Sequence, residues 1–203
     1  MILFPWQKQH PALRRFSQSI RSIRSDSPVE RTAAAVLDLE FDSLNLREAR
    51  ILSIAIVPIN QGWIDLDGLW SCYVQHTQQQ TEAIPIHGIL QAQLSAGLPE
   101  PEALEQCLLR LEGRLLVGHG LELDLQLLRK RFKALQWGPF RPKSQDTLLL
   151  ARRLDGPHQP PNASYQLSQL CKKHQLPHYA EHTAAGDALA TALLWLKLRE
   201  LAP

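Results

Sequence analysis

The chain has little of several residue types whose abundance would define its class. It has only three cysteines, at positions 72, 107 and 171, and each lies in an apolar stretch. An odd number of widely separated cysteines argues against a disulfide framework and against a zinc site, so we interpret all three as reduced core thiols. Reduced thiols are typical of cytoplasmic proteins, and we expect this chain in that compartment.

Long hydrophobic runs and a strong net charge are also missing. No apolar segment is long enough to span a bilayer and no secretory signal is visible, so we expect no membrane partner. With 44% hydrophobic residues, a chain of 203 residues can bury one substantial α/β core. A formal net charge of +2 is too small to identify a nucleic-acid-binding protein by itself.

The charge is unevenly distributed along the chain. Residues 1–31 contain six basic and two acidic residues, a net charge of +4, so the remainder carries −2. Within this segment apolar residues recur at helical spacing, from Leu13 through Phe16 and Ile20 to Ile23. We therefore predict a basic amphipathic N-terminal extension, residues 1–31, and a main domain, residues 32–203. The extension is either an accessory helix packed on the domain or a contact for nucleic acid or a partner.

Two further basic clusters lie in the main domain, at residues 129–133 and 141–143. They either flank a substrate groove and attract phosphates, or they are solvated helix ends. The sequence does not distinguish the two readings.

An apolar segment at residues 33–41 is interrupted only by two acids, Asp38 and Glu40. Strand periodicity places these acids on one face, roughly 7 Å apart along the chain. Ionised carboxylates in such a setting cost several kcal/mol unless they are paired or bound to metal, and Mg²⁺ or Mn²⁺ prefers oxygen ligands of this kind. The alternative is that the strand ends at Asp38 and both acids are solvated loop residues.

A third acid, Asp124, follows a small strand at residues 114–118 and a glycine-flanked turn. The helix predicted from Glu122 has a leucine stripe, and Asp124 lies on the same inward side. The alternative explanation is that an acid in the first helical turn complements the helix dipole.

A fourth acid, Asp187, opens the last helix, which is rich in alanine and leucine. Thr183 is the predicted N-cap, so His182 lies just before the helix and Asp187 about one turn inside it. A histidine beside a metal-bound water can act as a general base, because its pKa lies near the working pH. The chain has eight histidines, and only its position relative to Asp187 distinguishes His182.

Four carboxylates and one imidazole suffice to hold two divalent metals and to activate a water against a phosphodiester. The sequence therefore predicts nucleic-acid hydrolysis. We refer to the carboxylates as the four acids: Asp38, Glu40, Asp124 and Asp187.

The ordered motifs resemble the DEDDh family of 3′→5′ exonucleases, which includes the proofreading ε subunit of bacterial DNA polymerase III. The resemblance runs from about Ala33 to Leu198 and includes weaker noncatalytic landmarks at residues 86–89, 146–152 and 170–174. It implies that the four acids bind two Mg²⁺ or Mn²⁺ ions and that His182 is the general base. In the sister subfamily the base is a tyrosine one residue later, where this chain has Thr183.

The chain departs from the family pattern beside the motifs. The family's Thr-Thr-Gly-Leu after the first motif is here Phe41-Asp42-Ser43-Leu44, so Phe41 either stacks on a base or is a core residue at the strand end. The second motif begins with His119 but lacks the family's following amide and its aromatic residue. We take Phe41 and His119 as candidate substrate-binding residues.

The apolar patterns predict an α/β fold with a mixed sheet and helices on both faces, the ribonuclease-H-like architecture that the resemblance implies. An antiparallel meander of three strands is expected at residues 33–41, 51–59 and 69–75, and parallel strands at 114–118 and, weakly, at 140–145. Helices are expected over 101–112 and from residues 122, 147, 165 and 183. Asp146 most simply caps the helix that follows it.

The resemblance therefore implies a two-metal 3′→5′ exonuclease that acts on single-stranded 3′ ends of DNA. It is either free-standing or a small subunit, with a DNA polymerase subunit as a candidate partner. An RNA or short-oligonucleotide exonuclease would use the same residues, since recognition of the 2′-hydroxyl is not evident in this sequence. A nonhydrolytic module that binds nucleic acid or a polymerase is the alternative from another class.

Overall fold

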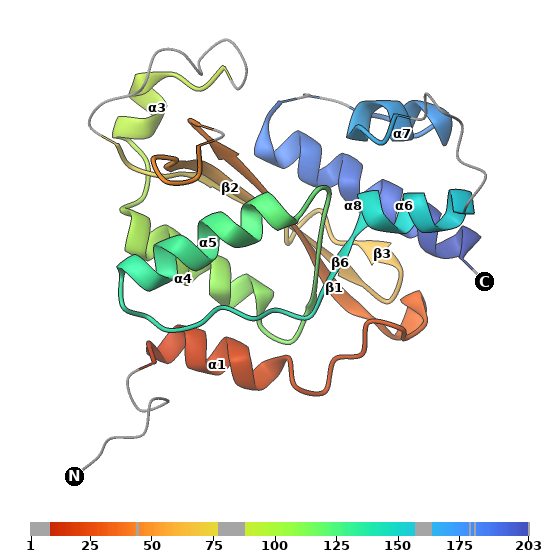
Figure 1. The fold of residues 1–203 in the computed structure, drawn as a ribbon, viewed down its shortest axis with the longest axis horizontal. Helices are drawn as coiled ribbons and strands as arrows, with labels where there is room; N and C mark the ends of the chain where they lie inside the picture. Colours follow the sequence, from red (N-terminus) through yellow and green to blue (C-terminus); the bar gives the residue numbers. More distant parts are fainter. Residues whose placement is uncertain are drawn as a thin grey trace.

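The computed structural model describes residues 9–43, 45–76, 88–156, 164–178, 180 and 182–202 (Figure 1). Residues 86 and 87 of the landmark at 86–89 thus lie outside the described residues. Leu44 and His158 also lie outside them.

Within these described residues, a mixed sheet of six strands forms the centre of the fold. Strand β1 (Ala33–Phe41) pairs antiparallel with β2 (Ile51–Asn60) and parallel with β5 (Leu115–Gly118). The short β6 (Ser144–Asp146) extends the sheet parallel to β5, and β3 (Trp63–Ile64) and β4 (Trp70–Tyr73) both pair antiparallel with β2. This arrangement confirms the predicted mixed sheet, with its antiparallel strands on one side of β1 and its parallel strands on the other.

Helices cover both faces of the sheet (Figure 1). One face packs against α1 (Pro11–Ser19), α4 (Glu100–Leu111) and α5 (Glu122–Ala134). The other face packs against α8 (Ala184–Leu201), whose outer side contacts α6 (Thr147–Asp155) and α7 (Leu167–Lys173). Three short elements were not predicted, namely β3, α3 (Gln91–Ser95) and a 3₁₀ turn (Val29–Arg31).

Strand β1 is buried on both faces, and its side chains alternate between the two helical layers. Ala35, Leu37 and Leu39 belong to the core under α1, α4 and α5, whereas Ala34 and Val36 belong to the core under α8. Because successive side chains of a strand point to opposite faces, the even-numbered positions of β1 face α8. Asp38 and Glu40 are therefore on the α8 side.

The helix predicted near the N-terminus is α1, and it packs on the main domain. Its apolar side chains, including Leu13 and Phe16, are buried in the same core as α4 and α5. His10, which precedes α1, stacks on Trp137 with ring centroids 3.8 Å apart. The division into residues 1–31 and 32–203 stays a prediction, but α1 is part of the main core.

The three cysteines form no disulfide, and Cys107 and Cys171 are buried whereas Cys72 is half-buried. Burial raises the pKa of Cys107 to about 12 and that of Cys72 to about 11, so both remain protonated at neutral pH. Within the described ranges, no helix combines the length and the hydropathy that crossing a bilayer requires.

Candidate active site

The site lies where β1 extends beyond its parallel neighbour. Strand β5 pairs with β1 only at residues 34–36, whereas β2 follows β1 as far as Phe41. The last part of β1, which carries Asp38 and Glu40, is therefore open on its β5 side. A sheet edge left open in this way can accept ligands and side chains from other elements.

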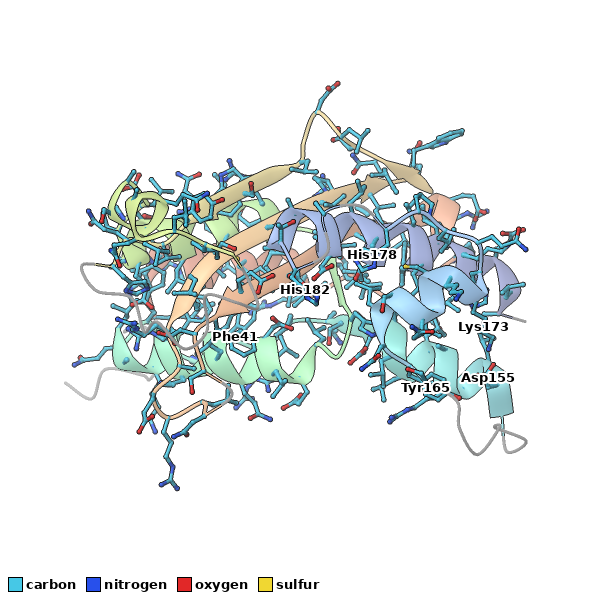
Figure 2. All side chains as sticks on the ribbon, turned by 90° about the horizontal axis from the view of Figure 1, so that it is seen from above. Phe41, Asp155, Tyr165, Lys173, His178 and His182 are labelled. Atoms are coloured by element: carbon cyan, nitrogen blue, oxygen red, sulfur yellow. The ribbon has the colours of Figure 1, made fainter. Side chains whose placement is uncertain are left out.

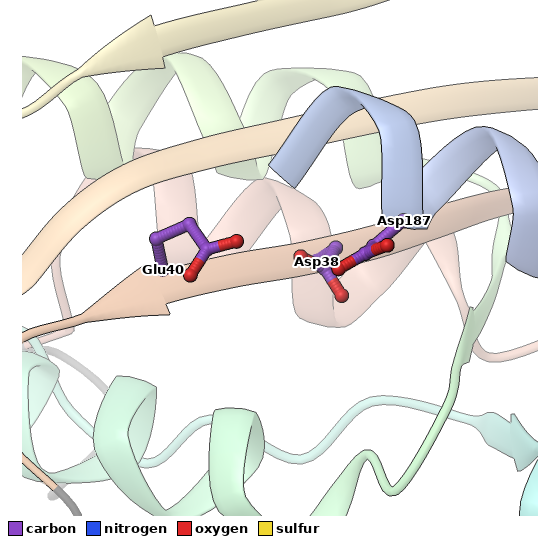
Figure 3. A group of neighbouring side chains, drawn as sticks. All are labelled: Asp38, Glu40 and Asp187. Carbon is purple, nitrogen blue, oxygen red and sulfur yellow. The ribbon is translucent and has the colours of Figure 1, made fainter. Parts of the chain in front are cut away.

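Helix α8 brings a third acid to this part of β1. Asp187 lies in the first turn of α8, and its carboxylate oxygens come together with those of Asp38 and Glu40 (Figure 3). One ligand atom from each of the three residues lies within 4.8 Å of the others. Such a cluster of oxygen atoms matches the ligands that Mg²⁺ and Mn²⁺ prefer.

Local sequence explains why α8 begins where it does. The Thr183 hydroxyl accepts the Gly186 N–H at 3.1 Å, as expected for the predicted N-cap, and donates to the Ala180 carbonyl at 2.7 Å. The side of α8 that faces the sheet is lined with small residues such as Ala184 and Ala188, which let the helix approach β1 closely. The cap sets where α8 begins, and the close packing sets its distance from β1. Together they determine the position of Asp187 relative to β1.

Asp124 approaches the same segment of β1 from α5. It lies in the first turn of that helix and is only 8% exposed, as the leucine stripe predicted. Its carboxyl is stabilised in the charged form by a hydrogen bond with the backbone of Leu39, which separates Asp38 from Glu40 in β1. Asp124 is not among the three acids whose oxygens converge, so the structure groups three of the four acids and holds the fourth beside them.

Burial and mutual repulsion raise the pKa values of Asp38, Glu40 and Asp124. Burial raises the pKa of Asp38 well above its usual value, and the charges of the other three acids raise it further. Burial and the charge of Asp187 raise the pKa of Glu40 to about 7. Burial also raises the pKa of Asp124 to about 8. A divalent cation would remove this repulsion, so the donor set fits a metal site.

Asp146 lies near this site but has a different environment. Its carboxylate accepts N–H groups from Gly120 at 3.0 Å, Leu121 at 2.9 Å and Leu148 at 2.9 Å. It therefore caps α6, as predicted, and also holds the turn that leads into α5. We assign it a structural role, because these backbone amides already occupy its oxygens.

Two histidines shortly precede Asp187 in the chain. His182 immediately precedes the N-cap, is exposed and has a left-handed backbone with φ 61°. His178 was not predicted as a site residue, and its Nε2 donates to Asp187 Oδ1 at 2.6 Å. The His178 and Asp187 side chains are 9% and 18% exposed. Figure 2 shows His182 between His178 and Phe41.

No sequence signal identified His178. It lies in an irregular segment after α7, so neither helical nor strand periodicity applies to it. The conformation of that segment brings the imidazole of His178 to Asp187, and no periodic spacing of residues in the sequence indicates this contact.

The two candidate substrate-binding residues, His119 and Phe41, differ in their contacts with the rest of the protein. Both ring nitrogens of His119 have partners, the Thr147 hydroxyl at 2.8 Å and the Tyr165 carbonyl at 2.9 Å. Burial lowers the pKa of His119, which favours the neutral ring. Phe41 is half-buried and packs on the core beneath β1. Substrate binding by either residue stays a prediction.

A small cavity adjoins the acids on the side of β4 and α3. Its volume is about 250 Å³, and it is lined by Glu40, Tyr73 and Gln93 and by the start of α8 at residues 183–185. Tyr73 accepts a hydrogen bond from the Gln93 amide at 2.6 Å through its hydroxyl oxygen. The cavity therefore combines an acidic end, at Glu40, with an aromatic and amide end, at Tyr73 and Gln93.

Comparison with known proteins identifies the family to which these features belong. The model of the exonuclease family RNase_T matches residues 35–195 of the chain. Relatives include a PolC-type DNA polymerase III from Thermotoga petrophila, 30% identical over 90% of this chain, and a 3′-5′ exonuclease DinG from Staphylococcus haemolyticus, 31% identical over 82%. The chain spans only 13% and 18% of the length of these two proteins.

A shorter relative is the DNA polymerase III subunit epsilon of Aquifex aeolicus, which is 27% identical over 81% of this chain and 79% of the relative. The fold is similar to that of E. coli exonuclease I, in a crystal structure with a dT13 oligonucleotide. The TM-score is 0.68 at 19% identity, over 82% of this chain and 40% of the other. This similarity confirms the predicted ribonuclease-H-like architecture.

Proposed function

The chain belongs to the RNase_T exonuclease family, and on this premise we propose that it is a metal-dependent 3′→5′ exonuclease of the DEDDh type. Its proposed substrate is a single-stranded 3′ end of DNA. The observation that carries the proposal is the convergence of Asp38, Glu40 and Asp187 oxygens within 4.8 Å, next to the buried Asp124.

The four acids would hold two Mg²⁺ or Mn²⁺ ions. Their ligand atoms are all carboxylate oxygens, which suits these cations. Burial, and after it repulsion between the acids, raises the pKa values of Asp38, Glu40 and Asp124, and a bound cation would offset both effects. When bound, such ions lower the pKa of water and stabilise charge on the attacking and leaving oxygens. Asp38, central in the cluster, is the residue we expect to be shared between the two ions.

The remaining residues would prepare the substrate and move the proton. We assign His182 as the general base, because it is accessible to water at the start of α8, five residues before Asp187. His178 would keep the Asp187 carboxylate in place through its 2.6 Å hydrogen bond. The cavity beside Glu40 would hold the terminal nucleotide, with its phosphodiester directed toward the acids.

The test is magnesium-dependent degradation of matched single-stranded DNA and RNA that carry a 5′ label. Wild-type protein should shorten the strand stepwise from its 3′ end, and Asp187→Ala should not. Asp67→Ala, which removes an exposed carboxylate outside the cluster, is the matched control and should keep full activity. Faster loss of RNA would establish the alternative substrate class. Binding without cleavage would favour the nonhydrolytic module.

A polymerase partner is a further part of the proposal. Two of the relatives are named as DNA polymerase III or its subunit epsilon, which supports a replication polymerase as the binding partner of this domain. Co-purification with a polymerase III catalytic subunit would test this part independently of nuclease activity.

A further inference from the structure

A basic groove lies beside α5, outside the cluster of acids. It has a volume of about 520 Å³ and lies between the second half of α5 and the loop that follows it. Three cationic side chains line it, Arg129 and Lys133 from α5 and Arg141 from the loop. The segment 138–140 forms its less polar wall.

The structure separates the basic residues of α5 into two groups. Lys130 donates to the carbonyl oxygens of Leu46, Arg47 and Ala49 at 2.7, 2.8 and 3.2 Å. Arg131 forms a bidentate ion pair with Glu100. These two residues therefore hold the fold together.

The remaining basic side chains of the groove come from both basic clusters of the sequence. Arg129 and Lys133 belong to residues 129–133, and Arg141 belongs to residues 141–143. Arg129 lies 3.5 Å from Glu122, in a pair whose side chains are 44% and 64% exposed, so its charge is only weakly compensated. Lys133 and Arg141 are exposed. Three like charges around one groove favour an anionic ligand, and guanidinium groups match the geometry of phosphate oxygens.

Helix α5 connects the groove to the active site. Asp124 lies in its first turn, and Lys133 is about 14 Å further along the helix axis, at a rise of 1.5 Å per residue. The chain after α5 runs back along the helix to β6 (Figure 1), where Asp146 binds the turn before α5. The groove therefore lies further along α5 than Asp124, at a distance that a single strand of a few nucleotides can span.

We propose that this groove binds the sugar-phosphate backbone of the nucleic-acid strand, several nucleotides to the 5′ side of the end held at the acids. The inference rests on the proposed function for the identity of the ligand. Arg129, Lys133 and Arg141 contact phosphates, so the groove contributes affinity that depends on strand length and not on base sequence.

The experiment compares Lys133→Ala/Arg141→Ala with wild type in two assays. Binding of a 5′-labelled oligothymidylate of about 20 nucleotides, measured by fluorescence anisotropy in EDTA, should weaken about tenfold. The slope of log K against log salt should become shallower by about 1.4, because each lost phosphate contact to a single strand contributes about 0.7. Hydrolysis of the p-nitrophenyl ester of thymidine 5′-monophosphate, which is too short to reach the groove, should be unchanged.

Arg153→Ala/Lys172→Ala is the matched control, since it removes two exposed positive charges from α6 and α7. It should leave the binding and its salt slope unchanged. Equal binding by wild type and the groove variant would overturn the inference even if the protein degrades DNA. Loss of binding in the groove variant would support it even if wild type hydrolyses neither substrate, an outcome that would reject only the proposed function.

Discussion

The acidic residues around the sheet differ in what their carboxylates face. Asp42 is buried against Arg50, whose Nε lies 2.6 Å from its Oδ2, and Asp146 accepts three backbone N–H groups. Asp38, Glu40 and Asp187 instead face one another. An acid whose charge is compensated within the protein stabilises the fold, whereas acids that repel one another require a cation from outside.

Replacing Asp38 or Asp187 by asparagine should abolish magnesium-dependent cleavage while the protein remains folded. The amide keeps the shape of the side chain but removes a charge that the metals require. Cleavage assays and circular dichroism check the two parts of this prediction. Magnesium-dependent turnover in either variant would show that its carboxylate is not an essential ligand.

His182 and His178 should respond differently to substitution. His182→Ala should lower kcat by about 10²–10⁴-fold and remove the rise of activity through neutral pH, because the general base is lost. His178→Ala should keep that pH profile but require about 10–100-fold more metal, because it only positions Asp187. Mn²⁺ binding by electron paramagnetic resonance gives a readout for His178 that is independent of turnover. The opposite pattern would exchange the two roles.

The termini of two helices position site residues through side-chain caps. Thr183 caps α8, which carries Asp187, and Asp146 caps α6 while holding the turn before α5, which carries Asp124. Both caps were predicted from sequence, since threonine and aspartate before an apolar helix are strong N-terminal signals. The second function of Asp146 was not predicted, because Gly120 and Leu121 are distant in the chain.

Thr183→Ala should destabilise the protein by about 1 kcal/mol, the usual cost of a lost N-cap. For a domain of this size the melting temperature should fall by about 2–4 °C. Thr183→Ser keeps the cap hydroxyl and is the control. A melting temperature equal to wild type for Thr183→Ala would mean that α8 is held by packing alone.

Over the whole molecule, the raised pKa values predict how stability depends on pH. Glu40 and Asp124 have folded-state pKa values of about 7 and 8, above their ordinary values near 4. Their protonated forms therefore favour the folded state. This stabilisation is complete below pH 4 and is lost as the pH rises through 7 and 8.

Metal-free protein in EDTA should accordingly melt at a lower temperature at pH 8 than at pH 6. Added Mn²⁺ should raise the melting temperature more at pH 8, where the acids are ionised and no proton competes with the metal. Asp124→Asn should stabilise the metal-free protein at pH 8 and reduce the response to Mn²⁺. Scanning fluorimetry at both pH values checks these signs, and an equal response to Mn²⁺ at both would contradict the prediction.

The sequence by itself determined the main elements and the identity of the acids. The continuous apolar strand at 33–41, the leucine stripe of α5 and the capped alanine-rich start of α8 are local patterns, and local periodicity and capping are readable along the chain. The order of the motifs also indicated a family of exonucleases, and the comparisons confirmed membership of an exonuclease family.

Only the tertiary structure decided which side chains meet. β6 has three residues and exists through its pairing with β5, so its sequence carries little signal. The contact between His178 and Asp187, and the joining of Arg141 to Arg129 and Lys133, depend on the paths of loops that have no periodicity. Contacts across the fold arise from packing between segments that are distant in the chain. A single sequence shows which residues are present, but it does not show which of these distant residues contact one another.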